Sequence, residues 1–199
     1  MKKYFEEVLP ENYEEAKTVD ASNKKMGLAM NAVALAVMAA GSLLSVLIIK
    51  PQDLFHNVDG ITMLVFCAVL IVYLVLHELV HGVVYKILTK KKLKFGIIST
   101  AAFCGVPDIY VYRNTALLSL AAPLTVFSAV FIAAALIFEN QWYKFLSLVA
   151  LFVHLGGCSG DIYDIILYFT KFRDPATLMR DTGPKQTFYV KNKQRMAGF

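Results

Sequence analysis

Four long runs of apolar residues constrain this chain more than any other feature of its sequence. They extend over about 26–49, 61–88, 115–138 and 142–172. A helix of about 20 apolar residues crosses the hydrocarbon layer of a bilayer, so each run is long enough for one crossing. Only 18% of the residues are charged, against about 25% in an ordinary soluble domain. The sequence therefore predicts an all-α integral membrane protein with about four transmembrane helices.

Polar segments at the two ends divide the chain into three predicted parts. We expect a cytoplasmic N-terminal segment at 1–25, a transmembrane domain at 26–172 and a basic cytoplasmic tail at 173–199. The N-terminal segment is mixed in charge and has no apolar stretch after its first lysines, so we expect no cleavable signal peptide. It has helical spacing in places and is interpreted as a partly amphipathic lead-in. In the tail, Thr182-Gly183 predicts the turn of a hairpin.

The distribution of basic residues predicts the orientation of the helices. Lysine and arginine gather in the loop at 89–114 and in the tail, whereas the loops at 50–60 and 139–144 hold one lysine each. Basic loops stay in the cytoplasm, so we expect a multi-pass protein of the cell membrane with both termini cytoplasmic. The net charge of +5 follows from this asymmetry. The lipid bilayer is therefore an expected partner and nucleic acid is not, while the oligomeric state is left open.

The loop between the second and third runs is predicted to form a small β-hairpin or a re-entrant loop. Its middle is rich in β-branched and aromatic residues with glycine and proline between them, a pattern typical of short strands. The two expected strands are "LKFGIIS" and "DIYVYRN". An exposed strand edge could hold an extended peptide by β-augmentation. The alternative is a plain connector that dips into the membrane.

The second apolar run contains "LVLHELVHGVV", residues 74–84. His77 and His81 are four residues apart, so their side chains share one face of a helix and can bind one metal ion. Glu78 lies beside them and is placed to act as a general base. This is the His-Glu-x-x-His arrangement of zinc peptidases, in which zinc lowers the pKa of its bound water to about 7.

Two interpretations of these ionisable residues are open at this point. They could form hydrogen bonds between packed helices without further function. However, a charged group inside a membrane costs about 2.5–3.5 kcal/mol even on insertion scales, and such residues usually mark functional sites. We therefore favour a metal site, with zinc chosen because imidazole and carboxylate ligands suit it.

A catalytic zinc ion needs a third protein ligand, and the fourth apolar run offers candidates. It is interrupted by "GGCSGD", residues 156–161, and glycine-rich breaks occur where the backbone of a spanning helix lines a site. Asp161 follows this break directly and is the preferred ligand. Asp164 and His154 are alternatives in the same run, and Asp108 is a more distant one. Asp161 and Asp164 could also cap the second half of a broken helix.

These motifs together resemble the site-2 protease class of intramembrane zinc metalloproteases. The resemblance is closest to the small bacterial membrane proteins of the putative zincin peptidase family, a domain of unknown function. It rests on "HELVH" at 77–81, "LSLAAPLTVFSAV" at 118–130 and "GGCSGDIYD" at 156–164, and covers about 61–172. It implies that His77, His81 and Asp161 bind one zinc ion per chain and that Glu78 is the base.

The chain departs from that pattern at two places. The asparagine that usually follows the proline is replaced in "TVFS" at 125–128, and the usual Leu-Asp-Gly is replaced by "SGDIYD". In "AAP" at 121–123, Pro123 is expected near the N-terminus of the third helix, a position that suits proline.

The predicted function is therefore that of an intramembrane zinc metalloprotease. It would hydrolyse a peptide bond in a transmembrane or membrane-adjacent substrate, with Glu78 activating the water. The alternative is a non-catalytic integral membrane protein that binds a metal or a partner. Glu78→Gln separates the two, because only a protease needs the carboxylate.

Overall fold

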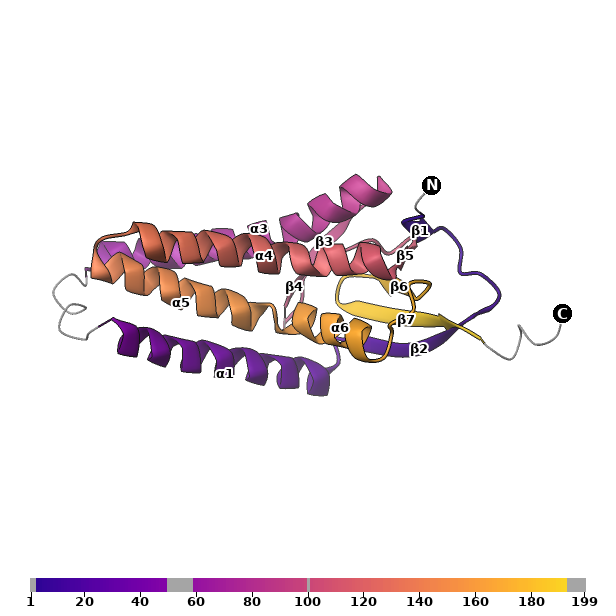
Figure 1. Ribbon diagram of the computed structural model, residues 1–199, viewed down its shortest axis with the longest axis horizontal. Coiled ribbons are helices and arrows are strands. Elements are labelled where there is room, and N and C mark those ends of the chain that lie inside the picture. Colours follow the sequence, from indigo (N-terminus) through magenta and orange to yellow (C-terminus); the bar gives the residue numbers. More distant parts are fainter. Residues whose placement is uncertain (1–2, 50–58, 100, 193–199) are drawn as a thin grey trace. The chain divides into compact units, whose positions relative to one another are not determined.

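The computed structural model of the chain describes residues 3–49, 59–99 and 101–192. The loop expected at 50–60 lies mostly outside these described residues. The helices are α1 (Lys24–Ile48), α3 (Gly60–Thr89), α4 (Arg113–Ile137), α5 (Gln141–Gly157) and α6 (Ser159–Thr170) (Figure 1). The strands are β1 (Phe5–Glu6), β2 (Tyr13–Asp20), β3 (Lys94–Ile97), β4 (Ala102–Gly105), β5 (Tyr110–Tyr112), β6 (Leu178–Asp181) and β7 (Lys185–Lys191).

The helices coincide with the four apolar runs to within a few residues. Among the described residues, α1, α3 and α4 are each long and apolar enough to cross a membrane. The pair α5 and α6 passes the same test together, with a bend of 53° at the break. The predicted interruption of the fourth run is thus confirmed: Cys158 is the C-cap of α5, and α6 begins at Ser159. The described part of the chain is compatible with three or four spans.

The expectation of an all-α protein is wrong, because a five-stranded antiparallel sheet is present. Its strand order is β1-β5-β6-β7-β2, and its strands come from the two ends of the chain and from the segment before α4. Tyr13 pairs with Lys191 and Asp20 with Lys185. The helical spacing noticed in the N-terminal segment therefore does not produce a helix, since β2 satisfies its backbone groups by pairing with β7. The predicted tail hairpin is confirmed, with β6 and β7 joined by a turn at 182–184.

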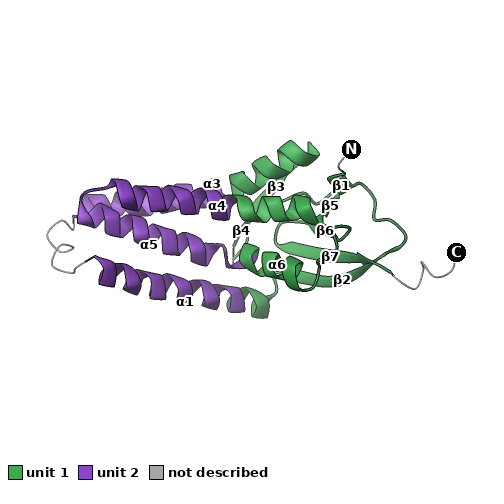
Figure 2. Ribbon diagram, viewed as in Figure 1, with its two compact units in different colours: residues 1–28, 78–122, 161–199 green, residues 29–77, 123–160 purple. Residues whose placement is uncertain are grey.

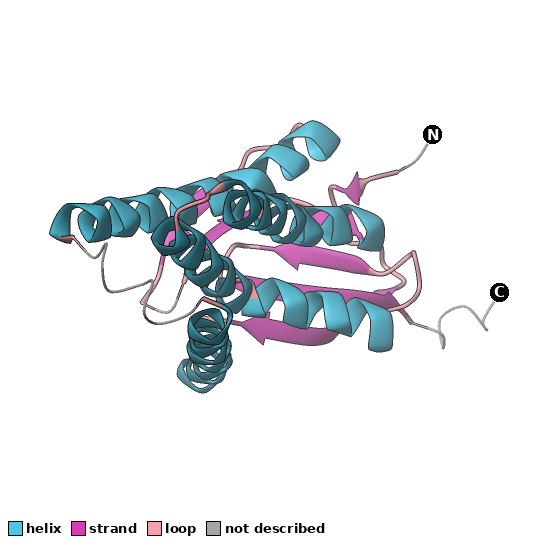
Figure 3. Cartoon of the chain, turned by 60° about the vertical axis from the view of Figure 1, so that its left-hand side comes forward, coloured by secondary structure: helices cyan, strands magenta, loops and turns pink. Residues whose placement is uncertain are grey.

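The hairpin between the second and third helices is confirmed, but one of its two strands was assigned wrongly. β3 pairs with β4, from Lys94 opposite Gly105 to Ile97 opposite Ala102. The segment "DIYVYRN" contributes β5 instead, which pairs with β1 and β6. Figure 3 shows the strands in magenta and the helices in cyan. Local sequence favoured a strand there, but long-range pairing selected its partners.

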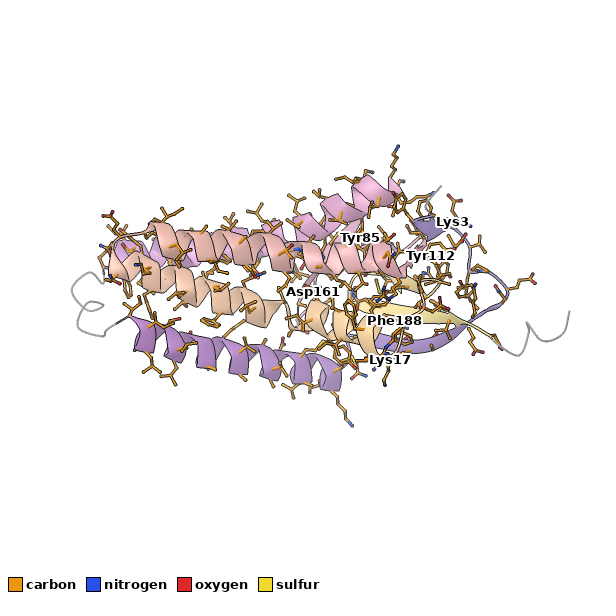
Figure 4. The ribbon with its side chains drawn as sticks, in the orientation of Figure 1. Lys3, Lys17, Tyr85, Tyr112, Asp161 and Phe188 are labelled. Atoms are coloured by element: carbon orange, nitrogen blue, oxygen red, sulfur yellow. The ribbon has the colours of Figure 1, made fainter. Side chains whose placement is uncertain are left out.

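The chain folds as two compact units (Figure 2). Unit 1 comprises residues 1–28, 78–122 and 161–199, and unit 2 comprises residues 29–77 and 123–160. Unit 1 contains both sheets and α6 from Asp161 onward. In its core, Tyr168 of α6 and Phe172, two residues after that helix, lie against Phe188 of β7, with ring centroids 5.1 and 4.6 Å apart. Phe188 is labelled in Figure 4.

Unit 2 is built from helices that approach each other through glycine. A Cβ atom on Gly41 of α1 would lie 2.0 Å from the ring of Phe152 of α5. A Cβ atom on Gly156 would lie 2.7 Å from the carbonyl oxygen of Ala34. Small residues allow such close packing of helices in membranes, so these two glycines let α1 and α5 pack tightly.

Candidate metal centre

The buried residues of α3 form one stripe along the helix. They are Tyr73, His77, His81, Gly82, Tyr85 and Thr89. Four-residue spacing places their side chains on a single helical face, while the exposed residues of α3 are mostly apolar. Both motif histidines therefore point away from the apolar surface of the helix. Glu78 is half-buried and follows His77 directly.

His81 is oriented by the backbone of α4. Its Nδ1 atom lies 2.9 Å from the carbonyl oxygen of Ser119. A carbonyl oxygen can only accept, so Nδ1 carries the proton and donates it. In neutral imidazole the other nitrogen, Nε2, then keeps its lone pair. This is the state in which a histidine binds a metal.

Pro123 explains why the Ser119 carbonyl is available to His81. The structure places Pro123 inside α4, ten residues after its first residue, Arg113; its expected position near the N-terminus of the helix is therefore wrong. Proline has no N–H, so it cannot donate to the carbonyl four residues earlier, which is that of Ser119. Proline is tolerated within spanning helices where another group satisfies the freed carbonyl. His81 is that group.

Asp161 lies beside His81 in unit 1. It belongs to the first turn of α6, and Figure 4 shows it close to the break between α5 and α6. Its Oδ1 atom is 3.4 Å from Nε2 of His81, and its side chain is 15% exposed. This nitrogen is the one that does not face the Ser119 carbonyl. The first turn of α6 thus brings a carboxylate to Nε2 of the second motif histidine.

The other candidate carboxylates are placed differently. Asp164 lies one turn after Asp161 and is 3% exposed. Its Oδ1 atom has no hydrogen-bond partner among the residues that the structure describes. Asp108 is exposed in the loop before β5. Within unit 1, the carboxylate that pairs with His81 is therefore that of Asp161.

His77 is the last residue of the first segment of unit 2, although α3 itself continues through the boundary. Its Nδ1 atom lies 3.2 Å from the hydroxyl of Tyr73. The same hydroxyl lies 2.8 Å from Nδ1 of His154, which is fully buried. Ligand atoms of His77, His154 and Cys158 lie within 4.8 Å of one another. His154, an alternative third ligand from the sequence, thus belongs to a polar cluster of unit 2.

The hairpin β3–β4 packs directly on α3 beside the motif. A Cβ atom on Gly82 would lie 2.8 Å from the ring of Phe95 and 3.2 Å from Sγ of Cys104, so only glycine fits here without movement. Burial, together with the nearby carboxylates of Asp181 and Glu78, raises the pKa of the Cys104 thiol to about 12. That thiol is therefore protonated at neutral pH and is no metal ligand in this form.

One turn after His81, α3 is tied to the five-stranded sheet. The Tyr85 hydroxyl donates to Oδ2 of Asp181 at 2.8 Å, and both residues are buried. The backbone N–H of Gly183 donates to Oδ1 of the same carboxylate at 2.9 Å. Tyr85 is labelled in Figure 4. The β6–β7 turn therefore fixes the part of α3 that follows the motif.

A comparison with known families identifies the matching region of the chain. The model of the putative zincin peptidase family matches residues 70–176, more than half of the sequence. The chain belongs to this family. The match includes the whole histidine motif, the β3–β4 hairpin, α4, α5, α6 and both candidate aspartates of α6. No curated protein and no solved structure matches the chain.

The family implies zinc, and the donor atoms of this zincin fit that metal. Two atoms that bind one zinc ion at about 2.0–2.1 Å in tetrahedral geometry lie roughly 3.4 Å apart. The atoms Nε2 of His81 and Oδ1 of Asp161 are 3.4 Å apart, longer than the 2.7–3.2 Å of an ordinary N–H···O hydrogen bond. The spacing therefore suits two ligands of one ion.

Sequence reasoning did not identify the groups that orient the histidines. Tyr73 could have been found, because it lies four residues before His77 on the face that the motif occupies. Pro123 carried a signal too, since a proline inside a helix frees the carbonyl four residues earlier. The carbonyl of Ser119 carries no signal of its own, because a backbone acceptor is present at every residue.

Proposed function

We propose that this zincin is an intramembrane zinc metalloprotease that cleaves a transmembrane or membrane-adjacent polypeptide. One observation carries the proposal: Nε2 of His81 and Oδ1 of Asp161 lie at the separation of two zinc ligands, with His77 one turn earlier on the same helix. In the proposed site, His77, His81 and Asp161 hold one zinc ion per chain. The family match supports the metallopeptidase class.

Each group of the motif then has one chemical task. When bound, zinc supplies Lewis-acid activation of the attacking water and of the scissile carbonyl. Glu78 accepts a proton from the water as its oxygen attacks the carbonyl carbon. Glu78 then gives the proton to the amide nitrogen as the C–N bond breaks, so that the new amine leaves neutral. The bond from His81 to Ser119 keeps the imidazole in its orientation throughout.

The apolar setting of the motif supports a membrane substrate. α3 is a 30-residue helix whose exposed residues are mostly apolar, so a substrate reaches Glu78 along a lipid-facing or interfacial route. A helical substrate hides its peptide bonds and must be held extended for cleavage. Among the described strands, β3 pairs with β4 alone, and its other edge could pair with an extended peptide. Phe95 and Ile97 of β3 are exposed and could contact the side chains of that peptide.

The proposed location is the cell membrane, with both termini in the cytoplasm. The apolar helices support a multi-pass protein, and the excess of lysine and arginine at 89–114 and in the tail supports this orientation. The bilayer and a polypeptide substrate are the proposed partners.

The experiment that tests the proposal begins with metal content. The protein is purified in detergent without chelators, and zinc is measured by elemental analysis in the wild type, His77→Ala, Asp161→Ala and Asp164→Ala. We expect one zinc ion per chain in the wild type and in Asp164→Ala, and almost none in the other two variants. Zinc retained in Asp161→Ala and lost in Asp164→Ala would assign the third ligand to Asp164.

Glu78→Gln then separates catalysis from metal binding. The amide cannot take up the proton, so we expect normal zinc content and at least a 100-fold loss of cleavage, the usual contribution of a general base. Cleavage is followed on a panel of single-span membrane proteins incubated with wild type or variant in the same vesicles. Cleavage that persists in Glu78→Gln, or a wild type without zinc, would contradict the protease.

A non-catalytic role in metal handling is the second candidate. It is favoured by the group of His77, His154 and Cys158, whose ligand atoms lie within 4.8 Å of one another. Such a protein would show metal-dependent behaviour that Glu78→Gln leaves unchanged.

A further inference from the structure

The Tyr73 hydroxyl lies between two histidines of unit 2. It is 3.2 Å from Nδ1 of His77 and 2.8 Å from Nδ1 of His154. A hydroxyl has one proton and two lone pairs. It can therefore donate to one of these nitrogens and accept from the other, but it cannot donate to both.

The backbone of α4 decides the direction of these bonds. Nε2 of His154 lies 3.3 Å from the carbonyl oxygen of Leu124, and a carbonyl oxygen only accepts. Nε2 of His154 therefore carries the proton, and in neutral imidazole Nδ1 has the lone pair.

The Leu124 carbonyl therefore fixes the donor and the acceptor in each hydrogen bond from His154 through Tyr73 to His77. Because Nδ1 of His154 accepts, the Tyr73 hydroxyl donates its proton to it. The Tyr73 oxygen is then left to accept, and the group that donates to it is N–H at Nδ1 of His77. With its proton on Nδ1, His77 has its lone pair on Nε2. This is the same tautomer that Ser119 imposes on His81.

We propose that Tyr73 and His154 are positioning residues that hold His77 in the tautomer whose Nε2 binds zinc. The inference rests on the proposed function for the role of the metal, but the hydrogen bonds among Tyr73, His77 and His154 are present without any metal. The groups that a metal-binding histidine contacts through its other nitrogen usually contribute 10- to 100-fold to metal affinity. Tyr73 and His154 would supply this contribution for His77.

Tyr73→Phe is the variant that tests the inference, because it removes only the hydroxyl. The Tyr73 ring packs edge-on against Phe127 and Phe131, with centroids 5.1 and 5.6 Å apart, and phenylalanine keeps these contacts. Tyr143→Phe is the matched control, since Tyr143 is 43% exposed in the same unit. Zinc affinity is measured by competition with chelators of graded strength. We expect it to fall about 10- to 100-fold in Tyr73→Phe and to be unchanged in Tyr143→Phe.

A second readout is independent of zinc. Nitrogen-15 NMR of histidine-labelled, zinc-free protein reports which ring nitrogen of His77 is protonated, with His77→Gln used to assign the signal. We expect protonation at Nδ1 in the wild type and in Tyr143→Phe, and a mixture of tautomers in Tyr73→Phe. A purely structural role of Tyr73 would leave this signal unchanged.

The possible results separate this inference from the proposed function. An unchanged affinity together with an unchanged His77 tautomer in Tyr73→Phe would overturn the positioning role. Two zinc ions in the wild type, one of them lost in Cys158→Ser, would overturn it in favour of a second metal site at His154 and Cys158. If the wild type binds no zinc, the proposed function fails, and the NMR result alone decides whether Tyr73 sets the tautomer of His77.

Discussion

Pro123 affects the candidate site because proline has no backbone N–H. Its missing N–H leaves the Ser119 carbonyl to His81, whose Nδ1 lies 2.9 Å away. If residue 123 had a backbone N–H, His81 would compete with it for the Ser119 carbonyl oxygen. The proline thus contributes to the site although its own side chain has no chemistry to offer.

Pro123→Ala should therefore stabilise the protein and weaken its metal binding. Alanine restores the helical N–H and is favoured over proline in a helix interior by about 3 kcal/mol, so the free energy of unfolding should rise by up to that amount. The restored amide competes with His81, so zinc affinity should fall about tenfold, the low end of the range for groups behind a ligand.

Thermal unfolding in detergent and chelator competition measure these two quantities. Leu118→Ala is the control, because Leu118 is 56% exposed on the same helix and its replacement leaves the Ser119 carbonyl as it is. A Pro123→Ala variant that is more stable but binds zinc as the wild type does would show that His81 does not depend on the proline.

For single residues, the sequence predicts well which side chains belong to the candidate site, but it predicts poorly which groups they contact. His77, Glu78 and His81 can be read from their spacing because helical geometry alone places them together. The nearness of Asp161 to His81 was expected only from the break in the fourth run and the family resemblance. The contact of His154 with Tyr73 cannot be predicted, because the two residues are 81 positions apart in the chain and nothing local connects them.

Among the elements, β6 ends at Asp181, a buried residue whose carboxyl group titrates with pH. Burial raises the pKa of Asp181 from 3.8 to about 6, although the N–H of Gly183 and the hydroxyl of Tyr85 partly oppose this shift. The fold therefore favours the protonated acid. Its contribution to stability is fully present below pH 3.8 and is lost as the pH rises through about 6.

We expect the stability of unit 1 to fall between pH 4 and 7 because of this group. A shift of about two pKa units corresponds to about 3 kcal/mol. Asp181→Asn removes the titration while keeping an acceptor for Gly183 or Tyr85. The stability of the wild type relative to Asp181→Asn, measured by thermal unfolding across this range, should therefore decline by up to about 3 kcal/mol. A difference that is constant with pH would refute the assignment.

The helices could be predicted from the sequence, whereas the strands β1, β2 and β4 could not. A membrane helix satisfies its own backbone groups, so a run of about 20 apolar residues is enough to define it. β2 is a charged segment whose partner β7 lies at the other end of the chain, and its pairing is a tertiary property. The segment around Tyr110 was recognised as a strand, but its partners were wrong because composition does not encode register.

For the whole molecule, the five-stranded sheet restricts how many times the chain crosses the membrane. β2 precedes α1, β5 lies between α3 and α4, and β7 follows α6. All three belong to one sheet, so in a membrane they would lie on one side of the bilayer. The chain must then cross an even number of times between β2 and β5, and again between β5 and β7. If α4 is one crossing of the second set, α5 and α6 together would be the other.

The predicted topology is therefore four spans, with both termini and the hairpin β3–β4 on the same side. Reporter fusions that are active only in the cytoplasm, placed after residue 192 and before residue 3, should both be active. Fusions at 139, between α4 and α5, should be inactive. Opposite results for the two termini would show that α5 and α6 do not form a span or that the sheet does not form in the membrane.

The pairing of β2 with β7 also has a consequence for how the protein is made. The two strands are separated by most of the chain, from Asp20 to Lys185. At about 5–20 residues per second, the ribosome needs roughly 10 to 30 s to deliver the second strand after the first. During this interval β2 cannot pair with β7, and the sheet that anchors α3 through Tyr85 and Asp181 is incomplete. A nascent zincin would thus lack the β6–β7 anchor of α3 until its last strand is released from the ribosome, and the proposed protease would stay inactive until then.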